Sequence, residues 1–120
     1  TILITDAIRA AGLGDGDYDV GGQPIAVRNG VARTLEGGLA GSTLALDQAL
    51  RNMMRFTGLS LSQILPMATS VPAEAMGWLG RRGVLQPGAD ADVVLLDADL
   101  RVRQTFIAGE MVWRSEDRQT

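Results

Sequence analysis

A short apolar run near the start of the chain, Ile2-Leu3-Ile4, constrains the fold more than any other feature of the sequence. Such a run is typical of a strand that is buried on both faces, as strands of parallel sheets are. The rest of the chain offers it no visible partner strand. We therefore expect an α/β fold in which this chain closes a larger structure. Because the chain opens inside the run and without Met, we also expect it to be a fragment of a longer protein.

The stretch after this run combines turn signals with two apolar segments. Residues 12–22 are rich in glycine and aspartate, and we interpret them as turns. An Asn29-Gly30 pair then separates two runs with strand character, which predicts a β-hairpin over residues 24–35.

The middle of the chain has helical spacing. Apolar residues recur at that spacing from Leu46 to the stop signal at Gly58, which predicts one amphipathic helix. Ser60 and Gln63 fit a capping box that opens a second helix. Pro66 predicts a kink or an early end of that helix, and Pro72 fits the first position of a third short helix. Residues 91–97 and 102–113, with a turn at Gly109, predict a strand followed by a second hairpin.

Composition narrows the chemistry. The 120 residues include 15 glycines and no cysteine or histidine, and the formal charge is −3. Without a basic stripe the chain is not expected to bind nucleic acid. No apolar run approaches the ~20 residues of a membrane helix, so we expect no membrane partner and a cytoplasmic location. Any catalysis by this chain must use carboxylates, hydroxyls or groups supplied from elsewhere.

Asp6 is the best catalytic candidate, because it lies just after the apolar run, with only Thr5 between them. Catalytic groups of β/α barrels lie where strands end and loops begin, and a carboxylate there can accept and return a proton. The alternative is an aspartate that only caps a turn.

Two other features favour simpler interpretations. The acidic residues 15–19 lack the glycine and the distal Glu of a full calcium loop, so we interpret them as a solvated turn. Asp90 and Asp92 would only blunt the start of a strand.

Four stretches together resemble one enzyme family. They are Thr5-Asp6-Ala7, residues 22–33 with their Asn29-Gly30 turn, Leu39-Ala40-Gly41-Ser42-Thr43-Leu44, and Arg51-Asn52 followed by residues 56–59. The combination resembles the last third of the N-acetylglucosamine-6-phosphate deacetylases of the amidohydrolase superfamily. Residues 83–93 resemble a segment found more broadly across that superfamily.

The resemblance implies a fold and a division of the chain. Residues 1–80 would form the end of a metal-dependent-hydrolase (β/α)8 (TIM) barrel. This part would contain the eighth strand, a β-hairpin insertion at about residues 17–35 and the last helices. Residues 81–120 would form the carboxy-terminal strands of a small β-sandwich.

The resemblance also assigns functional residues. Asp6 would be the catalytic acid/base, which deprotonates a metal-bound water and then protonates the departing amine. Leu39, Ala40 and Gly41 would contact the amino-sugar phosphate substrate. The divalent metal, of the zinc or iron class, would be held by Glu and His ligands upstream of Thr1, so no metal ligand and no bound metal are expected in this chain alone. We further expect a homo-oligomer.

Two rival interpretations stay open at this point. A non-catalytic β-rich interaction module would use Asp6 only structurally, and the absence of histidine favours it for this chain. Another amidohydrolase, such as a deaminase or a cyclic amidase, would also account for residues 83–93. If the parent is the deacetylase, the isolated chain is expected to be inactive because the metal ligands are missing.

Overall fold

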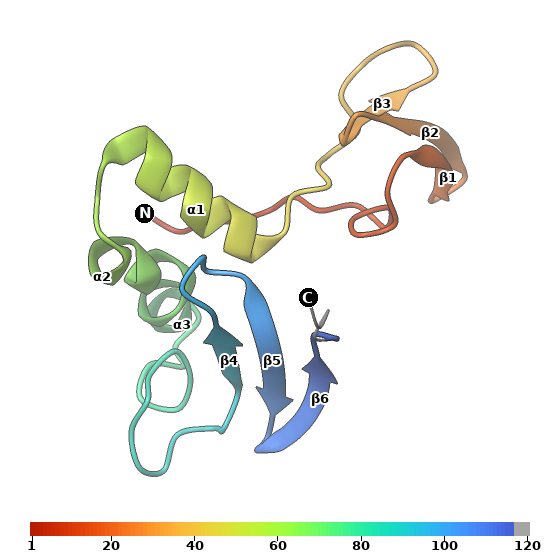
Figure 1. Cartoon of the computed structure of the whole chain (residues 1–120). Coiled ribbons are helices and arrows are strands. Elements are labelled where there is room, and N and C mark those ends of the chain that lie inside the picture. Colours follow the sequence, from red (N-terminus) through yellow and green to blue (C-terminus); the bar gives the residue numbers. More distant parts are fainter. Residues whose placement is uncertain (117–120) are drawn as a thin grey trace. The chain divides into compact units, whose positions relative to one another are not determined.

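The computed structural model describes residues 1–116, and helices and strands are mixed along this length. Figure 1 shows two three-stranded sheets separated along the chain by helices. The chain divides into two compact units, one of Ile4–Ala49 and one of Thr1–Leu3 together with the chain from Leu50 onward. Residues 117–120, the end of the expected sandwich segment, lie outside the described residues.

The predicted hairpin around Asn29-Gly30 is confirmed. Strands β2 (Gln23–Arg28) and β3 (Val31–Thr34) pair antiparallel, with Arg28 opposite Val31. Asn29 and Gly30 have φ angles of 51° and 73°, the left-handed pair that a tight two-residue hairpin turn requires. The chain direction therefore reverses where the sequence predicts it.

The interpretation of residues 15–19 as a solvated turn is wrong. Gly16–Val20 forms strand β1, which pairs antiparallel with β2 and gives the sheet order β1-β2-β3. Tyr18 and Val20 alternate with two aspartates and pack against the core of this unit. The period of two that defines a half-buried strand was present in the sequence, but the aspartates obscured it.

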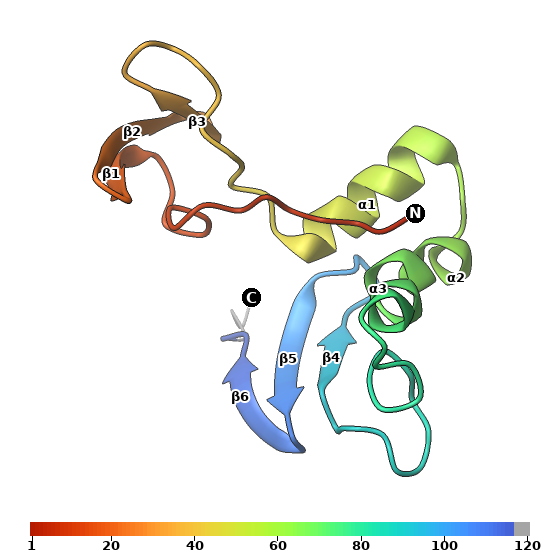
Figure 2. The same cartoon turned by 180° about the vertical axis from the view of Figure 1, so that it is seen from behind.

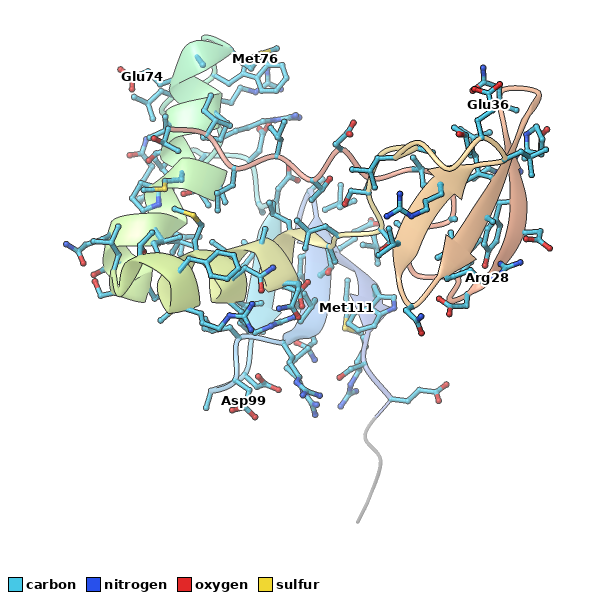
Figure 3. The ribbon with its side chains drawn as sticks, turned by 90° about the horizontal axis from the view of Figure 1, so that it is seen from above. Arg28, Glu36, Glu74, Met76, Asp99 and Met111 are labelled. Atoms are coloured by element: carbon cyan, nitrogen blue, oxygen red, sulfur yellow. The ribbon has the colours of Figure 1, made fainter. Side chains whose placement is uncertain are left out.

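An ion pair joins the first two strands. The Arg28 guanidinium donates to Asp17 Oδ1 at 2.6 Å and to the Gly16 carbonyl at 2.9 Å. Figure 3 shows Arg28 and Glu36 at opposite ends of the sheet. The Arg28 guanidinium is thus held by two groups of β1 and by the Val27 carbonyl of β2, to which it donates at 2.8 Å.

A small apolar core supports this first unit. Its buried members come from the segment before β1 and from strands β2 and β3: Ala10, Ile25, Val27 and Ala32. Ile8 and Ala40 pack against them from the two segments that carry the candidate site. Burial of these side chains therefore holds both segments on the same small sheet.

Helix α1 (Leu46–Thr57) agrees with the prediction. It ends at Gly58, whose φ of 73° is the left-handed conformation that commonly ends a helix, and the Gly58 N–H donates to the Met54 carbonyl at 2.9 Å. Asp47 lies in the first turn and Arg55 in the last, where each charge is favourable to the helix dipole.

The next helical segment is broken where Pro66 predicts a break. The capping box of Ser60 and Gln63 opens α2 (Leu61–Ile64), with the Ser60 N–H donating to Gln63 Oε1 at 2.9 Å. The chain then tightens into a 3-10 turn, η1 (Leu65–Ala68), because proline has no N–H to continue an α-helix. Figure 2 shows the short helices in succession.

The third short helix begins earlier than predicted. Helix α3 spans Ser70–Ala75, so Pro72 is its third residue and not its first. The first N–H groups of a helix have no partner within the helix, so proline is tolerated in the first turn at either place. Gly77, with φ 72°, follows the end of the helix as expected.

The predicted terminal strands form the second sheet. Strands β4 (Val93–Leu96), β5 (Val102–Ile107) and β6 (Glu110–Arg114) pair antiparallel in the order β4-β5-β6. Asp92 does more than precede β4, because its Oδ1 accepts the N–H of Ala108, in the turn between β5 and β6, at 2.9 Å.

The prediction of a strand over residues 1–5 is wrong. This stretch has no strand assignment, and Ile4 is 75% exposed. The Leu3 N–H donates to the Met67 carbonyl at 2.9 Å, a single contact with a 3-10 turn. An apolar run reports a preference for burial, whereas a strand also needs a neighbouring strand for its backbone hydrogen bonds.

Candidate functional site

Asp6 lies where the extended start of the chain turns into the first unit. Its carboxylate is exposed, and its φ of 50° places the backbone in the left-handed region. Aspartate and asparagine are the residues other than glycine that most often adopt this conformation. The next N–H, that of Ala7, donates to Thr5 Oγ1 at 3.3 Å, a local contact that helps the chain to turn.

The backbone on both sides of Asp6 is fixed by one residue, Ser42. The Ser42 N–H donates to the Asp6 carbonyl at 2.9 Å, and the Ser42 carbonyl accepts the Ile8 N–H at 2.8 Å. These two bonds form a parallel bridge between Ala7 and Ser42. Two segments 35 residues apart in sequence, counted from Ala7 to Ser42, are thereby joined at the candidate catalytic residue.

Gly41 lies directly beside Asp6. A Cβ built at Gly41 would lie 3.7 Å from Asp6 Oδ2 and 3.1 Å from the Asp6 carbonyl oxygen. It would also lie 2.6 Å from Ile8 Cγ2, closer than real Cβ contacts. The structure thus brings together Asp6 and Gly41, two of the residues that the family resemblance assigned to the site.

Leu39 and Ala40 lie on the strand-like path that leads to Gly41. Leu39 bridges Arg33 in antiparallel fashion, and the Ala40 N–H donates to the Ala32 carbonyl at 3.0 Å. Ala40 is half-buried against the core, whereas the Leu39 side chain is 72% exposed. Within residues 1–116, the N–H groups of Leu39 and Gly41 make no hydrogen bond, which leaves two donors for a polar ligand.

The sequence did not single out Ser42 as a site residue, although it belongs to the quoted motif. Its role depends on the backbone, which no residue type reveals. The side chain adds a local constraint, because Ser42 Oγ accepts the Leu44 N–H at 2.7 Å. The neighbouring Thr43 Oγ1 donates to the Gly30 carbonyl at 2.6 Å, and so ties the loop to the hairpin turn.

Asp15 is a second residue whose role the sequence did not show. Its two carboxylate oxygens accept the N–H groups of Asn29 and Gly30 at 2.6 Å and 3.0 Å. The hydrogen bonds from Gly30 and Asn29, in that order of effect, hold the pKa of the Asp15 carboxyl below its ordinary value. The carboxylate therefore stabilises the turn to which Thr43 is tied.

The residues that the structure describes do not fit a metal site. The sequence has no histidine or cysteine, and in residues 1–116 no three carboxylates lie close enough together to hold an ion. In the same part of the chain, no helix combines the length and the apolar character of a membrane span. The chemistry that this chain itself can supply is that of the exposed Asp6 carboxylate and the adjacent loop.

A sequence profile described as the amidohydrolase family matches residues 5–112, from the residue before Asp6 to the last strand. The chain belongs to the amidohydrolase family. Metal dependence is general in this family. Family membership disfavours the rival interpretation of a non-catalytic interaction module.

Relatives extend the similarity to deacetylases of amino-sugar phosphates. The chain is 46% identical over 110 residues to a putative N-acetylgalactosamine-6-phosphate deacetylase of Escherichia coli K12, covering 92% of this chain and 66% of that protein. It is 41% identical over 118 residues to the N-acetylglucosamine-6-phosphate deacetylase of Bos taurus, covering 97% of this chain and 29% of that protein. The expected resemblance to N-acetylglucosamine-6-phosphate deacetylases is confirmed.

Solved structures agree. The N-acetylglucosamine-6-phosphate deacetylase of Thermotoga maritima superposes with a TM-score of 0.84 at 42% identity, over 95% of this chain and 31% of that one. A variant of the deacetylase of Mycobacterium smegmatis, in complex with N-acetyl-D-glucosamine-6-phosphate, superposes with a TM-score of 0.80 at 40% identity, over 92% of this chain and 30% of that one. The amidohydrolase chain thus spans about a third of these solved relatives.

Proposed function

We propose that this chain is the segment of a deacetylase that carries the general acid/base, Asp6. The reaction is hydrolysis of N-acetylglucosamine 6-phosphate to glucosamine 6-phosphate and acetate, in amino-sugar catabolism. The observation that carries the proposal is the exposed Asp6 carboxylate, whose backbone is fixed by Ser42 beside the Leu39-Ala40-Gly41 loop. Deacetylase relatives align over nearly the whole of this segment.

The proposed chemistry needs one proton to be accepted and then returned. Asp6 accepts a proton from the water whose oxygen forms a bond to the acetamide carbonyl carbon. The carbon–nitrogen bond of the tetrahedral intermediate then breaks, and Asp6 returns the proton to the departing amine nitrogen. The products are acetate and the free amino sugar, and Asp6 ends in its starting carboxylate form.

The loop before Ser42 supports a second role, that of holding the substrate. The N–H groups of Leu39 and Gly41 can donate to sugar hydroxyl or amide oxygens, and the exposed Leu39 side chain can pack against the sugar ring. Ala40 is already packed on the core and fixes the loop in place. We assign Leu39, Ala40 and Gly41 to substrate binding on this basis.

In this proposal, the metal on which the family depends is held by segments outside this chain. A zinc- or iron-class ion would polarise the acetamide carbonyl when bound, but residues 1–116 contain no cluster of three side chains that could hold it. In the same proposal, residues 1–80 form the end of a (β/α)8 barrel and residues 81–120 form strands of a β-sandwich. The assembled enzyme is proposed to be a homo-oligomer.

A second substrate is favoured by one observation. Two relatives named for N-acetylgalactosamine 6-phosphate are 46% identical to the chain. The bovine enzyme, which is named for N-acetylglucosamine 6-phosphate, is 41% identical to it. The two sugars are epimers at one carbon and carry the same acetamide group, so Asp6 would have the same task in both. The scissile bond does not distinguish them.

Acetate release by the full-length protein tests the function. Both epimers are supplied separately, and kcat/KM is measured for each. The proposal expects hydrolysis of N-acetylglucosamine 6-phosphate, and a higher kcat/KM for the galactosamine epimer would favour the second substrate. Hydrolysis of neither compound by the folded, metal-loaded protein would refute both, and would return attention to deaminase or cyclic amidase chemistry.

A further inference from the structure

The backbone of Asp6 has an unusual conformation for its place in the fold. Four residues other than glycine have left-handed φ angles within residues 1–116. Three of them, Asn29, Leu100 and Ala108, lie in turns that join consecutive strands. Asp6 lies in no such turn, and its φ of 50° is held by the bridge to Ser42. Uncommon backbone conformations of this kind often occur at functional sites, where they fix the direction of a side chain.

Gly41 is the residue that makes this conformation sterically possible. It precedes Ser42, which donates to the Asp6 carbonyl, and its own φ is 78°. Any side chain at this position would press on two atoms at once, Ile8 Cγ2 at 2.6 Å and the Asp6 carbonyl oxygen at 3.1 Å. Since Ile8 is packed against the core, it cannot easily move away.

We propose that Gly41 is a positioning residue for Asp6: the missing side chain lets the two segments approach closely enough for Ser42 to hold the aspartate in its left-handed conformation. This inference rests on the proposed function of Asp6 as acid/base and goes beyond the role of Gly41 in substrate binding. The direction of a side chain follows the backbone, so a shift of the Asp6 backbone moves its carboxylate with it. Proton transfer is sensitive to such shifts, because a displacement of about 1 Å can lower a rate about 100-fold.

Gly37 provides a matched control. It also has a left-handed φ, 86°, and it belongs to the same unit, but a Cβ built on it meets no atom within 4 Å. Alanine at either position therefore has the same backbone strain, and only alanine at Gly41 also presses on Asp6 and Ile8. A difference between the two variants isolates the contact from the conformational penalty.

The test compares Gly41→Ala with Gly37→Ala in the full-length enzyme. Gly41→Ala is expected to lower kcat at least about 10-fold more than Gly37→Ala, within the range that misplacement of a catalytic group allows. Its KM is expected to stay within about threefold, because the lost interaction belongs to the transition state. A raised KM with unchanged kcat would overturn the inference and leave Gly41 as a substrate contact. Equal kcat values for the two variants would also overturn it.

Removing the opposing methyl group provides the rescue. Gly41→Ala combined with Ile8→Ala relieves the 2.6 Å contact but keeps the 3.1 Å contact with the Asp6 carbonyl, so kcat should recover in part. If Gly41→Ala alone does not fold, this double variant is compared with Ile8→Ala instead, and equal kcat values would refute the inference. Asp6→Asn distinguishes the acid/base role of Asp6 from the positioning role of Gly41. If that variant keeps its kcat, the proposed function of Asp6 is refuted. If only the Gly41 variants match their controls, the positioning role alone fails.

Discussion

The Asp6 carbonyl oxygen accepts the Ser42 N–H at 2.9 Å, and the Ser42 carbonyl accepts the Ile8 N–H at 2.8 Å. These two bonds surround the candidate acid/base and join it to the loop that contains the other candidate site residues. The small core beneath, with Ile8 and Ala40 packed against it, holds the same two segments. The site of this amidohydrolase segment therefore depends on backbone contacts as well as on the Asp6 side chain.

The hairpin turn is expected to lose stability as the pH falls. The pKa of Asp15 is lowered in the folded state by the N–H groups of Gly30 and Asn29, so the folded state favours the carboxylate. The stabilisation is present above the ordinary carboxyl pKa of about 3.9 and is lost as the pH falls through the lower folded-state value. Asp15→Asn should remove this component at neutral pH, because one amide oxygen cannot replace two charged acceptors.

Hydrogen exchange and urea unfolding measure this effect. The Asn29 and Gly30 amides should exchange faster in Asp15→Asn than in the unmodified chain. Unfolding between pH 6 and pH 3 should show a smaller drop in stability for the variant. Asp99→Asn is a suitable control, because Asp99 lies in the turn between β4 and β5 with its side chain directed away from that sheet (Figure 3). Identical amide exchange in all three proteins would show that Asp15 does not hold the turn.

Gly83→Ala is expected to destabilise the second unit strongly. A Cβ at Gly83 would lie 2.5 Å from the Thr69 carbonyl oxygen and 2.9 Å from Ala73 Cβ, and the φ of 73° adds strain. We expect a loss of about 2–4 kcal/mol from overpacking and strain together. Gly88→Ala, at φ 87° with no atom within 4 Å, should cost only about 1–2 kcal/mol. Thermal unfolding of both variants measures these losses of stability. Equal losses for Gly83→Ala and Gly88→Ala would contradict the close approach at Gly83.

The sequence predicted elements whose signals are local. The Asn29-Gly30 turn, the apolar face of α1 and the capping box at Ser60 each depend on residues within one turn or one helix, and all three are confirmed. The predicted strand over residues 1–5 does not form among the described residues, because a strand needs a partner and the sequence already offered this run none. Strand β1 was missed because Asp17 and Asp19, on its exposed face, obscured its period of two.

For the candidate site too, the sequence predicted what depends on local signals and missed what depends on contacts between distant segments. Asp6 could be selected from the sequence because a carboxylate follows an apolar run, and the structure places it beside Gly41. The parts played by Ser42 and Ile8 could not be selected, because they arise from backbone contacts between segments about 35 residues apart. Small residues in succession, as at residues 40–42, are the one local signal that two segments of the chain approach closely there.

The 120-residue chain by itself is expected not to bind one equivalent of zinc or ferrous iron. Its carboxylates are dispersed within residues 1–116, and it has neither histidine nor cysteine to complete a tetrahedral site. Isothermal titration with each metal, followed by an acetate-release assay with and without a chelator, measures this directly. Stoichiometric binding together with chelator-sensitive turnover would show that the segment assembles a site of its own.

The kcat of Asp6→Asn in the full-length enzyme tests the central claim most directly. The amide is nearly the same size as the carboxylate, so folding and KM should change little, but it cannot accept the proton of water or return one to the amine. General acid–base catalysis is typically worth about 10²–10⁴-fold, so kcat should fall by at least about 100-fold while Asp99→Asn keeps its activity. A kcat for Asp6→Asn above about a tenth of the unmodified enzyme's would contradict the account and leave Asp6 as a turn residue.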